Sequence, residues 1–201
     1  EEAIWLARTV VELLPGEPEG LGLLALLQYC EARRPARRDA AGEYVPISMQ
    51  DPRQWDGARL EEAERSLARA AKEGRTGRFQ LEAAIQSAHA ERARGGSIDW
   101  SAVALLYEGL VRTAPTVGAL LGRAAAVAES RGPRDGLALL GAIPPSMVET
   151  HQPYWAVRAH LLRRLGNLGE ARTAYQTAMR LTDDDAVKRF LECMSDEPMD
   201  G

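Results

Sequence analysis

The chain has 201 residues, a net charge of −4 at pH 7, 45% hydrophobic residues and 5% aromatic residues. This length suits one domain or one small superhelical array, and the net charge excludes a global basic field that would hold nucleic acid. The longest apolar run, Leu23 to Leu27, is far shorter than the roughly 20 residues that span a membrane. Two distant cysteines, Cys30 and Cys193, suit a reducing compartment, so we expect a cytoplasmic protein with no membrane partner.

Apolar residues at helical spacing, interrupted by proline and glycine, predict helices in the first half of the chain. These helices cover about residues 1–14, 19–34, 54–73, 78–92 and 99–113. Asp51 or Asp56 can cap the third helix, and Asp99 can cap the fifth. Residues 35–55 show no periodicity, and loops of this length are functional or disordered. This loop contains Trp55 and other large apolar residues, so we expect much of it to be ordered.

The second half of the chain predicts helices over about 117–130, 134–140, 152–165 and 168–181, then a final helix to about residue 194. The helix over 134–140 is short because Pro133 precedes it and Pro144-Pro145 follow it, and proline removes a backbone donor. Thr182 or Asp183 can cap the final helix. We expect about ten helices from the usual helix length. They form a single domain over residues 1–194, followed by a flexible tail over 195–201.

A spaced pattern near the end of the chain indicates how the helices pair. Small residues, Ala159 and Ala171, stand where two antiparallel helices would cross closely, and Gly166 stands where the first of them would end. The full pattern is Trp155, Ala159, Leu162, Gly166, Ala171, Tyr175 and Ala178. It matches the signature positions of a tetratricopeptide repeat, a helix hairpin that buries its apolar face only against neighbouring hairpins.

The same spacing recurs earlier in the chain, in steps of about 34 residues. Two steps back lie Val103, Tyr107 and Leu110; a further step, with a few residues inserted, leads to Ala63, Leu67 and Ala70. The unit between is degenerate and places Leu137, Gly141 and Pro144 at these positions. We therefore predict an all-α, tetratricopeptide-like array of antiparallel helix hairpins. Such an array provides a binding surface rather than catalysis.

Several blocks go beyond a generic repeat and occur in a fixed order. They are residues 13–26, 32–37, 51–56, 79–85 with His89, 99–100 and 161–166. Together they resemble the C-terminal extension of a large subgroup of bacterial extracytoplasmic-function sigma factors, which belong to the sigma-70 family. The chain departs from this resemblance at residues 44–49 and at Pro144-Pro145, which affects loops only.

The resemblance implies a regulatory protein-interaction domain that modulates promoter-directed transcription initiation by the full-length protein. The promoter-recognition domains of such proteins are expected upstream of residue 1, so DNA is contacted only through those missing domains. The implied partners are the sigma domains of the same protein, core RNA polymerase, or another regulatory protein. Two other hypotheses remain open: a stand-alone tetratricopeptide scaffold or adaptor, and an enzyme with a helical pocket.

The first candidate docking surface consists of Arg33, Arg34, Arg37, Asp51, Arg53 and Trp55. The arginines with Arg38 form the densest basic patch, which can contact an acidic partner or simply complement the end of a helix. The block from Asp51 to Trp55 can dock a partner. Alternatively, Trp55 anchors the long loop and Arg53 pairs with a carboxylate, which is the interpretation we favour.

The second candidate face consists of Phe79, Gln80 and His89, which helical spacing places on one side of the same helix. These residues can face a binding groove or can be buried polar groups with satisfied hydrogen bonds. We interpret Glu61, Glu62 and Glu64 as a solvated helix face. His89, His151 and His160 lack metal-binding spacing, and no nucleophile signature or phosphate loop is recognisable. We therefore expect no enzyme activity, cofactor or metal.

Overall fold

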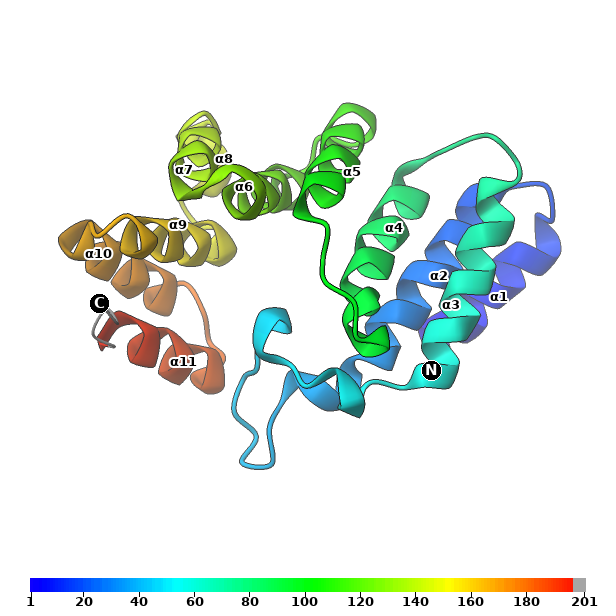
Figure 1. Cartoon of the computed structure of the whole chain (residues 1–201), viewed down its shortest axis with the longest axis horizontal. Coiled ribbons are helices and arrows are strands. Elements are labelled where there is room, and N and C mark those ends of the chain that lie inside the picture. Colours follow the sequence, from blue (N-terminus) through cyan, green and yellow to red (C-terminus); the bar gives the residue numbers. More distant parts are fainter. Residues whose placement is uncertain (197–201) are drawn as a thin grey trace. The chain divides into compact units, whose positions relative to one another are not determined.

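Helices account for the regular structure of residues 1–196, the part of the chain that the computed structural model describes. Eleven α-helices and four short 3-10 helices occur there without a strand, which confirms the predicted all-α class (Figure 1). The sequence predicts one domain over residues 1–194, whereas the structure divides into two compact units. Unit 1 comprises Glu1–Arg38 and Val45–Ala114, and unit 2 comprises Asp39–Tyr44 and the chain from Pro115 onward.

Unit 1 is built around its second helix. Its α-helices are α1 (Glu2–Leu13), α2 (Pro18–Ala32), α3 (Gly57–Ala71), α4 (Arg78–Ala90) and α5 (Trp100–Thr113). Helix α2 packs against α1, α3 and α4, and α5 packs against α4. Because α2 has neighbours on three sides, its buried residues occur all around its axis, from Leu21 and Leu24 to Tyr29 and Ala32.

Two close contacts bring α2 and α4 together. A Cβ atom added to Gly22 would lie 2.7 Å from the backbone nitrogen of Gln80, so only glycine allows this approach. The Glu19 carboxylate accepts hydrogen bonds from the backbone N–H groups of Phe79 and Gln80, at 2.8 and 3.1 Å. A side chain of α2 therefore caps the N-terminus of α4, a role that the residue immediately before a helix usually fills.

The part of the long loop that belongs to unit 1 is folded, as its apolar content predicts. It contains the 3-10 helices η1 (Arg34–Arg37), η2 (Ile47–Met49) and η3 (Pro52–Gln54). Arg92, in η4 (Glu91–Arg94), donates hydrogen bonds to the carbonyl oxygens of Ile47 at 2.6 Å and Gln50 at 2.9 Å. Its guanidinium also lies over the Trp55 ring. One cation thus satisfies carbonyl groups that lack a regular partner and fixes the loop.

Unit 2 contains α6 (Val117–Arg131), α7 (Pro133–Gly141), α8 (Pro145–Val148), α9 (Gln152–Arg164), α10 (Leu168–Arg180) and α11 (Asp185–Asp196). The predicted hairpin register is confirmed, because Ala159 on α9 and Ala171, Tyr175 and Ala178 on α10 are all buried. Gly166 has φ +78°, the left-handed conformation predicted for the end of the first helix. Among the earlier register positions, Ala63, Ala70, Val103 and Leu110 are buried, whereas Leu67 and Tyr107 are half-buried. In the degenerate unit Leu137 is half-buried, and Gly141 and Pro144 are exposed.

The structure corrects several details of unit 2. Helix α8 was not predicted; its single turn begins at Pro145, since proline suits the first position of a helix. The cap of α11 is Asp184, whose carboxylate accepts from Ala186 N at 3.0 Å, rather than Thr182 or Asp183. Helix α11 extends to Asp196 instead of ending near 194. The rest of the predicted flexible tail, residues 197–201, lies outside the described residues.

Candidate functional site

Two of the six residues in the first predicted docking surface are buried. The Trp55 side chain is 6% exposed and packs in the core of unit 1, and Arg33 is 9% exposed and donates a hydrogen bond to Gln86. Neither side chain can meet a partner, because each is enclosed by its own unit. Including Arg33 and Trp55 in a docking surface is therefore wrong, and the alternative role of Trp55 as a loop anchor is confirmed.

Of the other four residues of that surface, the three arginines are exposed and Asp51 is half-buried, and all four have local partners. Arg34 forms an ion pair with Glu31 at 3.1 Å, and Arg37 donates a hydrogen bond to the Cys30 carbonyl at 3.0 Å. Arg53 forms a two-point pair with Asp51, with hydrogen bonds of 2.8 and 3.0 Å. These pairs confirm the carboxylate partner predicted for Arg53. They leave a small polar patch without an apolar centre.

The second predicted face lies inside unit 1. Gln80 is buried, and its side-chain amide donates to the Arg75 carbonyl at 2.7 Å. His89 is buried against Trp100, with ring centroids 5.6 Å apart, and burial lowers the pKa of its imidazole to about 4. Phe79 is half-buried beneath the guanidinium of Arg78. A groove lined by Gln80 and His89 is therefore ruled out, and these residues are interior polar groups.

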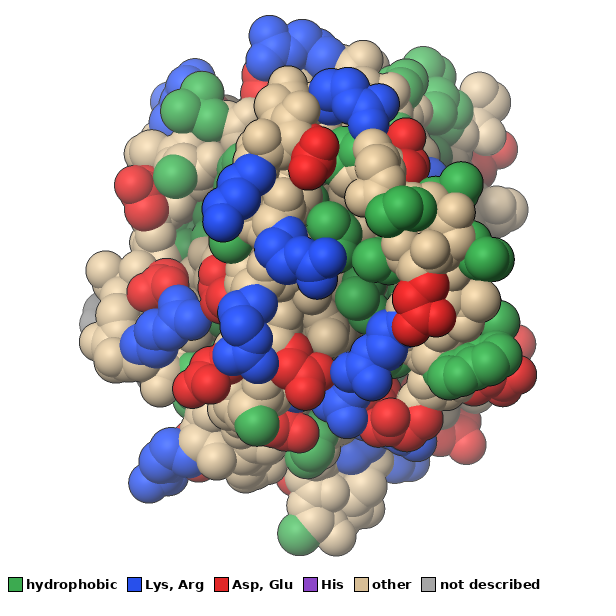
Figure 2. Space-filling model, turned by 90° about the vertical axis from the view of Figure 1, so that its right-hand side faces the viewer, with side chains coloured by type: hydrophobic (Ala, Val, Ile, Leu, Met, Phe, Trp, Pro, Cys, Tyr) green, Lys and Arg blue, Asp and Glu red, His purple; other side chains and the backbone are tan. Residues whose placement is uncertain are grey.

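The structure instead forms a groove between α1 and α3, with α2 as its floor. Its volume is about 520 Å³. The lining residues come from all three helices: Arg8, Val11, Glu12, Leu24, Gln28, Glu62, Arg65, Ser66 and Arg69. Figure 2 views this side of the molecule and shows basic and acidic side chains standing around exposed apolar atoms. We call this feature the α1–α3 groove.

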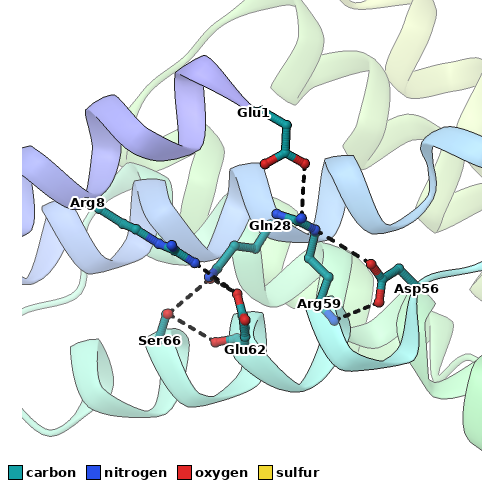
Figure 3. A network of polar contacts seen from close by, with 7 residues as sticks. All are labelled: Glu1, Arg8, Gln28, Asp56, Arg59, Glu62 and Ser66. Carbon is teal, nitrogen blue, oxygen red and sulfur yellow. Dashed lines mark hydrogen bonds and ion pairs between the residues drawn. The ribbon is translucent and has the colours of Figure 1, made fainter.

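A polar network holds the walls of the groove together (Figure 3). Glu62 on α3 accepts hydrogen bonds from Arg8 on α1 and from Gln28 on α2, both at 3.1 Å. The Ser66 hydroxyl lies 3.0 Å from Gln28 Oε1. Because Gln28 is only 2% exposed, these bonds satisfy an amide that would otherwise be costly to bury. The network thus fixes the spacing of three helices at one point.

A second group of polar contacts joins the start of α1 to the start of α3. Arg59 donates to the Glu1 carboxylate at 3.0 Å, and its backbone N–H donates to Asp56 at 3.1 Å. Asp56 is therefore the N-cap of α3, one of the two caps that the sequence predicts. An adjoining hollow of about 390 Å³ lies here and shares Arg8 and Glu62 with the α1–α3 groove.

Charge is distributed unevenly around the groove. Glu62 is engaged by Arg8, so its charge is largely offset. On the α3 rim, Arg65 stands 3.7 Å from Glu61, and exposed Arg69 extends the basic rim by one turn. Val11 and Leu24 provide apolar surface between the rims. The groove therefore suits a segment that inserts an apolar side chain and places a carboxylate beside α3.

Sequence reasoning missed this groove because its walls are separated by about fifty residues of chain, a span that no local pattern covers. The solvated face predicted for Glu61, Glu62 and Glu64 holds for exposed Glu61 only. Glu62 and Glu64 are half-buried: Glu62 binds Arg8 and Gln28, and Glu64 accepts a hydrogen bond from Ser87 at 2.7 Å. One signal was present. Gln28 and Ser66 are polar residues within otherwise apolar stripes, and buried polar residues require partners.

Two kinds of feature are absent from residues 1–196. No helix there is both long enough and apolar enough to cross a membrane. No group of three or more His, Cys, Asp or Glu side chains in this part of the chain is arranged to hold a metal ion.

Comparison with known proteins adds two matches. Residues 1–71 match the model of DUF6596, which is described as a family of unknown function. These residues include α1, α2 and α3, the helices that line the groove. The chain is also 35% identical over 196 residues to "Uncharacterized protein R00370" of Rhizobium meliloti (strain 1021). That match covers 98% of this chain and 46% of the relative, so the chain spans about half the length of the curated relative. No solved structure matches the chain.

Proposed function

We propose that this chain is the regulatory C-terminal protein-interaction domain of an RNA polymerase sigma factor, acting in the cytoplasm. The observation that carries the proposal is the ordered series of sequence blocks from residue 13 to residue 166. The length of the relative supports it, because a protein about twice as long has room for promoter-recognition domains. Under this proposal the domain modulates transcription initiation through protein contacts, and DNA is contacted by the other domains.

The α1–α3 groove is the proposed regulatory contact. Its apolar side chains, Val11 and Leu24, and its basic α3 rim provide what the two predicted surfaces lack, a concave site with apolar surface between charged edges. The partner segment would come from the sigma domains of the same protein, from core RNA polymerase or from another regulator. In each case an acidic residue of that segment would face Arg65 and Arg69.

The test uses the full-length protein with purified core RNA polymerase. We expect the wild type to bind the core enzyme and to support promoter-dependent transcription. Reversing the charge of Arg65 and Arg69 together should change transcript yield at least about threefold, roughly the loss of one exposed charge pair. Because both side chains are exposed, thermal unfolding should remain nearly unchanged. Arg172→Glu, an exposed site on α10, is the matched control.

The outcomes separate the competing functions. If the full-length protein did not bind core RNA polymerase, the sigma-factor proposal would be refuted and a stand-alone adaptor would be favoured. Binding with unchanged transcription by the Arg65/Arg69 variant would leave the sigma role intact but remove the groove as its regulatory surface.

A further inference from the structure

The α1–α3 groove continues into the hollow that adjoins it, and one stripe of residues on each wall faces these two spaces. The stripe on α1 is Glu1, Trp5, Arg8 and Glu12. The stripe on α3 is Arg59, Glu62, Ser66 and Arg69. Successive members of a stripe are three or four residues apart, so each stripe follows one side of its helix for about three turns, roughly 16 Å. The two spaces together therefore have the length of a short helix.

An ion pair stands between the two spaces. Arg8 and Glu62, 3.1 Å apart, line both of them (Figure 3). On one side of this pair lies Trp5, which is 64% exposed and lines the hollow. On the other side Val11 and Leu24 line the groove. Trp5 and Val11 lie about 9 Å apart along the axis of α1. Apolar surface is therefore available at two points, one on each side of a polar bridge.

Exposed charges differ between the two walls. Glu2 and Glu12 are exposed on α1, and Arg65 and Arg69 are exposed on α3. All four line the groove or the hollow. Within residues 1–196, neither Glu12 nor Arg69 forms an ion pair with another side chain. The α1 edge is therefore acidic and the α3 edge is basic, a difference that a partner carrying both charges can use.

We propose that this groove binds an amphipathic helix of about three turns that a separate regulatory protein supplies. The inference rests on the proposed function and specifies the partner of the same surface. The helix carries two apolar side chains seven residues apart, about 10 Å along its axis, which enter the spaces on either side of the Arg8–Glu62 pair. Its acidic flank faces Arg65 and Arg69, and its basic flank faces Glu12.

The backbone chemistry of the walls favours a helix over an extended segment. Both walls are helices, whose backbone groups are bonded within α1 and α3, so an extended segment would find no ladder of partners. A helix satisfies its own backbone groups and needs only side-chain contacts. The opposite charges of its flanks also specify its direction, because a reversed helix would place carboxylates against Glu12.

The size of the contact favours a regulator that binds reversibly over a second copy of the chain. A helix of three turns brings about ten residues into the groove, fewer than the roughly 20–30 residues on each side of a stable interface. Contacts of this size are typical of transient complexes. The groove therefore suits a partner whose binding can be gained and lost.

The test measures the fluorescence anisotropy of labelled, alanine-based helical peptides of about 14 residues on titration with the full-length protein. The matching peptide has two leucines seven residues apart, glutamates on one flank and lysines on the other. In the control peptide one leucine moves to the opposite face, which keeps the composition. We expect the matching peptide to bind at least about tenfold more tightly, the factor that burial of one leucine side chain contributes.

Charge reversal tests the two edges separately. Arg65→Glu combined with Arg69→Glu should weaken binding of the matching peptide at least about threefold, and so should Glu12→Lys. A peptide with lysines on both flanks should bind the arginine double variant more tightly than it binds the wild type, a reversal that a misfolded groove would not produce. Arg172→Glu, at an exposed site on α10, is the matched control and should leave the affinity unchanged.

Equal binding of the matching and control peptides would overturn the proposal, and so would charge-reversed variants that bind the matching peptide as the wild type does. If the peptide dissociated a dimer of the full-length protein, a second copy would be the occupant and the assignment to a separate protein would be wrong. Peptide binding by a protein that does not bind core RNA polymerase would refute the proposed function and leave this inference standing. Altered transcription by the arginine double variant without peptide binding would refute only this inference.

Discussion

His89 shows, at the residue scale, how position in the fold changes the chemistry of a side chain. Burial, together with the nearby positive charges of Arg33 and Arg92, lowers its pKa from 6.5 to about 4. Its Nδ1 atom is buried without a hydrogen-bond partner. Both facts favour the neutral imidazole, which packs against Trp100. His89 therefore contributes to the interior of unit 1 only while it is uncharged.

A pH dependence of stability follows from this shift. As the pH falls below 6.5, the unfolded chain binds the His89 proton before the folded chain does, so stability falls between pH 6.5 and about 4. Between pH 7 and pH 5 the loss should be about 2 kcal/mol. Urea unfolding at both pH values, for the wild type and His89→Gln, measures it. If the variant loses as much stability as the wild type over this interval, the assignment to His89 is wrong.

Trp55 and Arg53 lie two residues apart, but their substitution should change stability by very different amounts. Trp55→Ala removes a buried ring from the core and from beneath Arg92, so the free energy of unfolding should fall by about 3–5 kcal/mol. Arg53→Ala breaks only an exposed pair with Asp51, which solvent screens, so the free energy of unfolding should hardly change. Denaturant unfolding of both variants checks the contrast. Similar losses would show that the exposed pair, and not only the ring, holds the loop.

At the scale of elements, the crossing of α2 and α4 depends on one glycine. Gly22→Ala would place a methyl group against the backbone of Gln80, which cannot move without displacing α4. We expect a loss of about 1–3 kcal/mol in the free energy of unfolding. Gly169→Ala on α10 is the control, because nothing lies within 4 Å of its added Cβ. That change should stabilise the protein by roughly 0.5–1 kcal/mol, the helix preference of alanine over glycine. If Gly22→Ala left the free energy of unfolding unchanged, α2 and α4 would not be in tight contact.

In the α9–α10 hairpin, substitutions at a buried and at a neighbouring exposed position should also differ in their effect on stability. Ala171 is buried at the contact between the two helices, and Arg172 beside it is exposed. Ala171→Leu should overpack the hairpin and cost about 1–3 kcal/mol, whereas Arg172→Leu should change stability by less than about 0.5 kcal/mol. Chemical denaturation distinguishes the two. A fully stable Ala171→Leu protein would contradict the close crossing.

At the scale of the whole molecule, net charge predicts behaviour toward nucleic acid. The chain carries 25 basic and 29 acidic residues, and its exposed arginines have carboxylates among them, as at Arg34, Arg53 and Arg65. Residues 1–201 should therefore show no sequence-specific binding to duplex DNA at physiological salt, which a mobility-shift assay with competitor DNA measures. A band shift that only one competitor DNA sequence abolishes would contradict this prediction. It would also contradict the assignment of DNA contact to other domains.

The sequence alone predicts ten of the eleven α-helices in residues 1–196, all except the single turn α8, and the local pairing of α9 with α10. Proline, glycine and the capping residues Asp56 and Asp99 act within a few residues of the helix ends they define, so they can be read without the fold. The small residues Ala159 and Ala171 likewise define a crossing between helices that are adjacent in the chain. Signals of this kind are local, and the structure confirms them.

Only the tertiary structure decided which side chains are available to a partner. Arg33, Gln80 and His89 are polar residues of types that are common at surfaces, but segments distant in the chain enclose them. Glu19 caps a helix that begins about sixty residues later, and Arg92 fixes carbonyl groups more than forty residues earlier. The α1–α3 groove forms in the same way, from Arg8 and Glu62 on helices brought together by α2. Burial is a sum over such long-range contacts, and local sequence spacing contains no information about them.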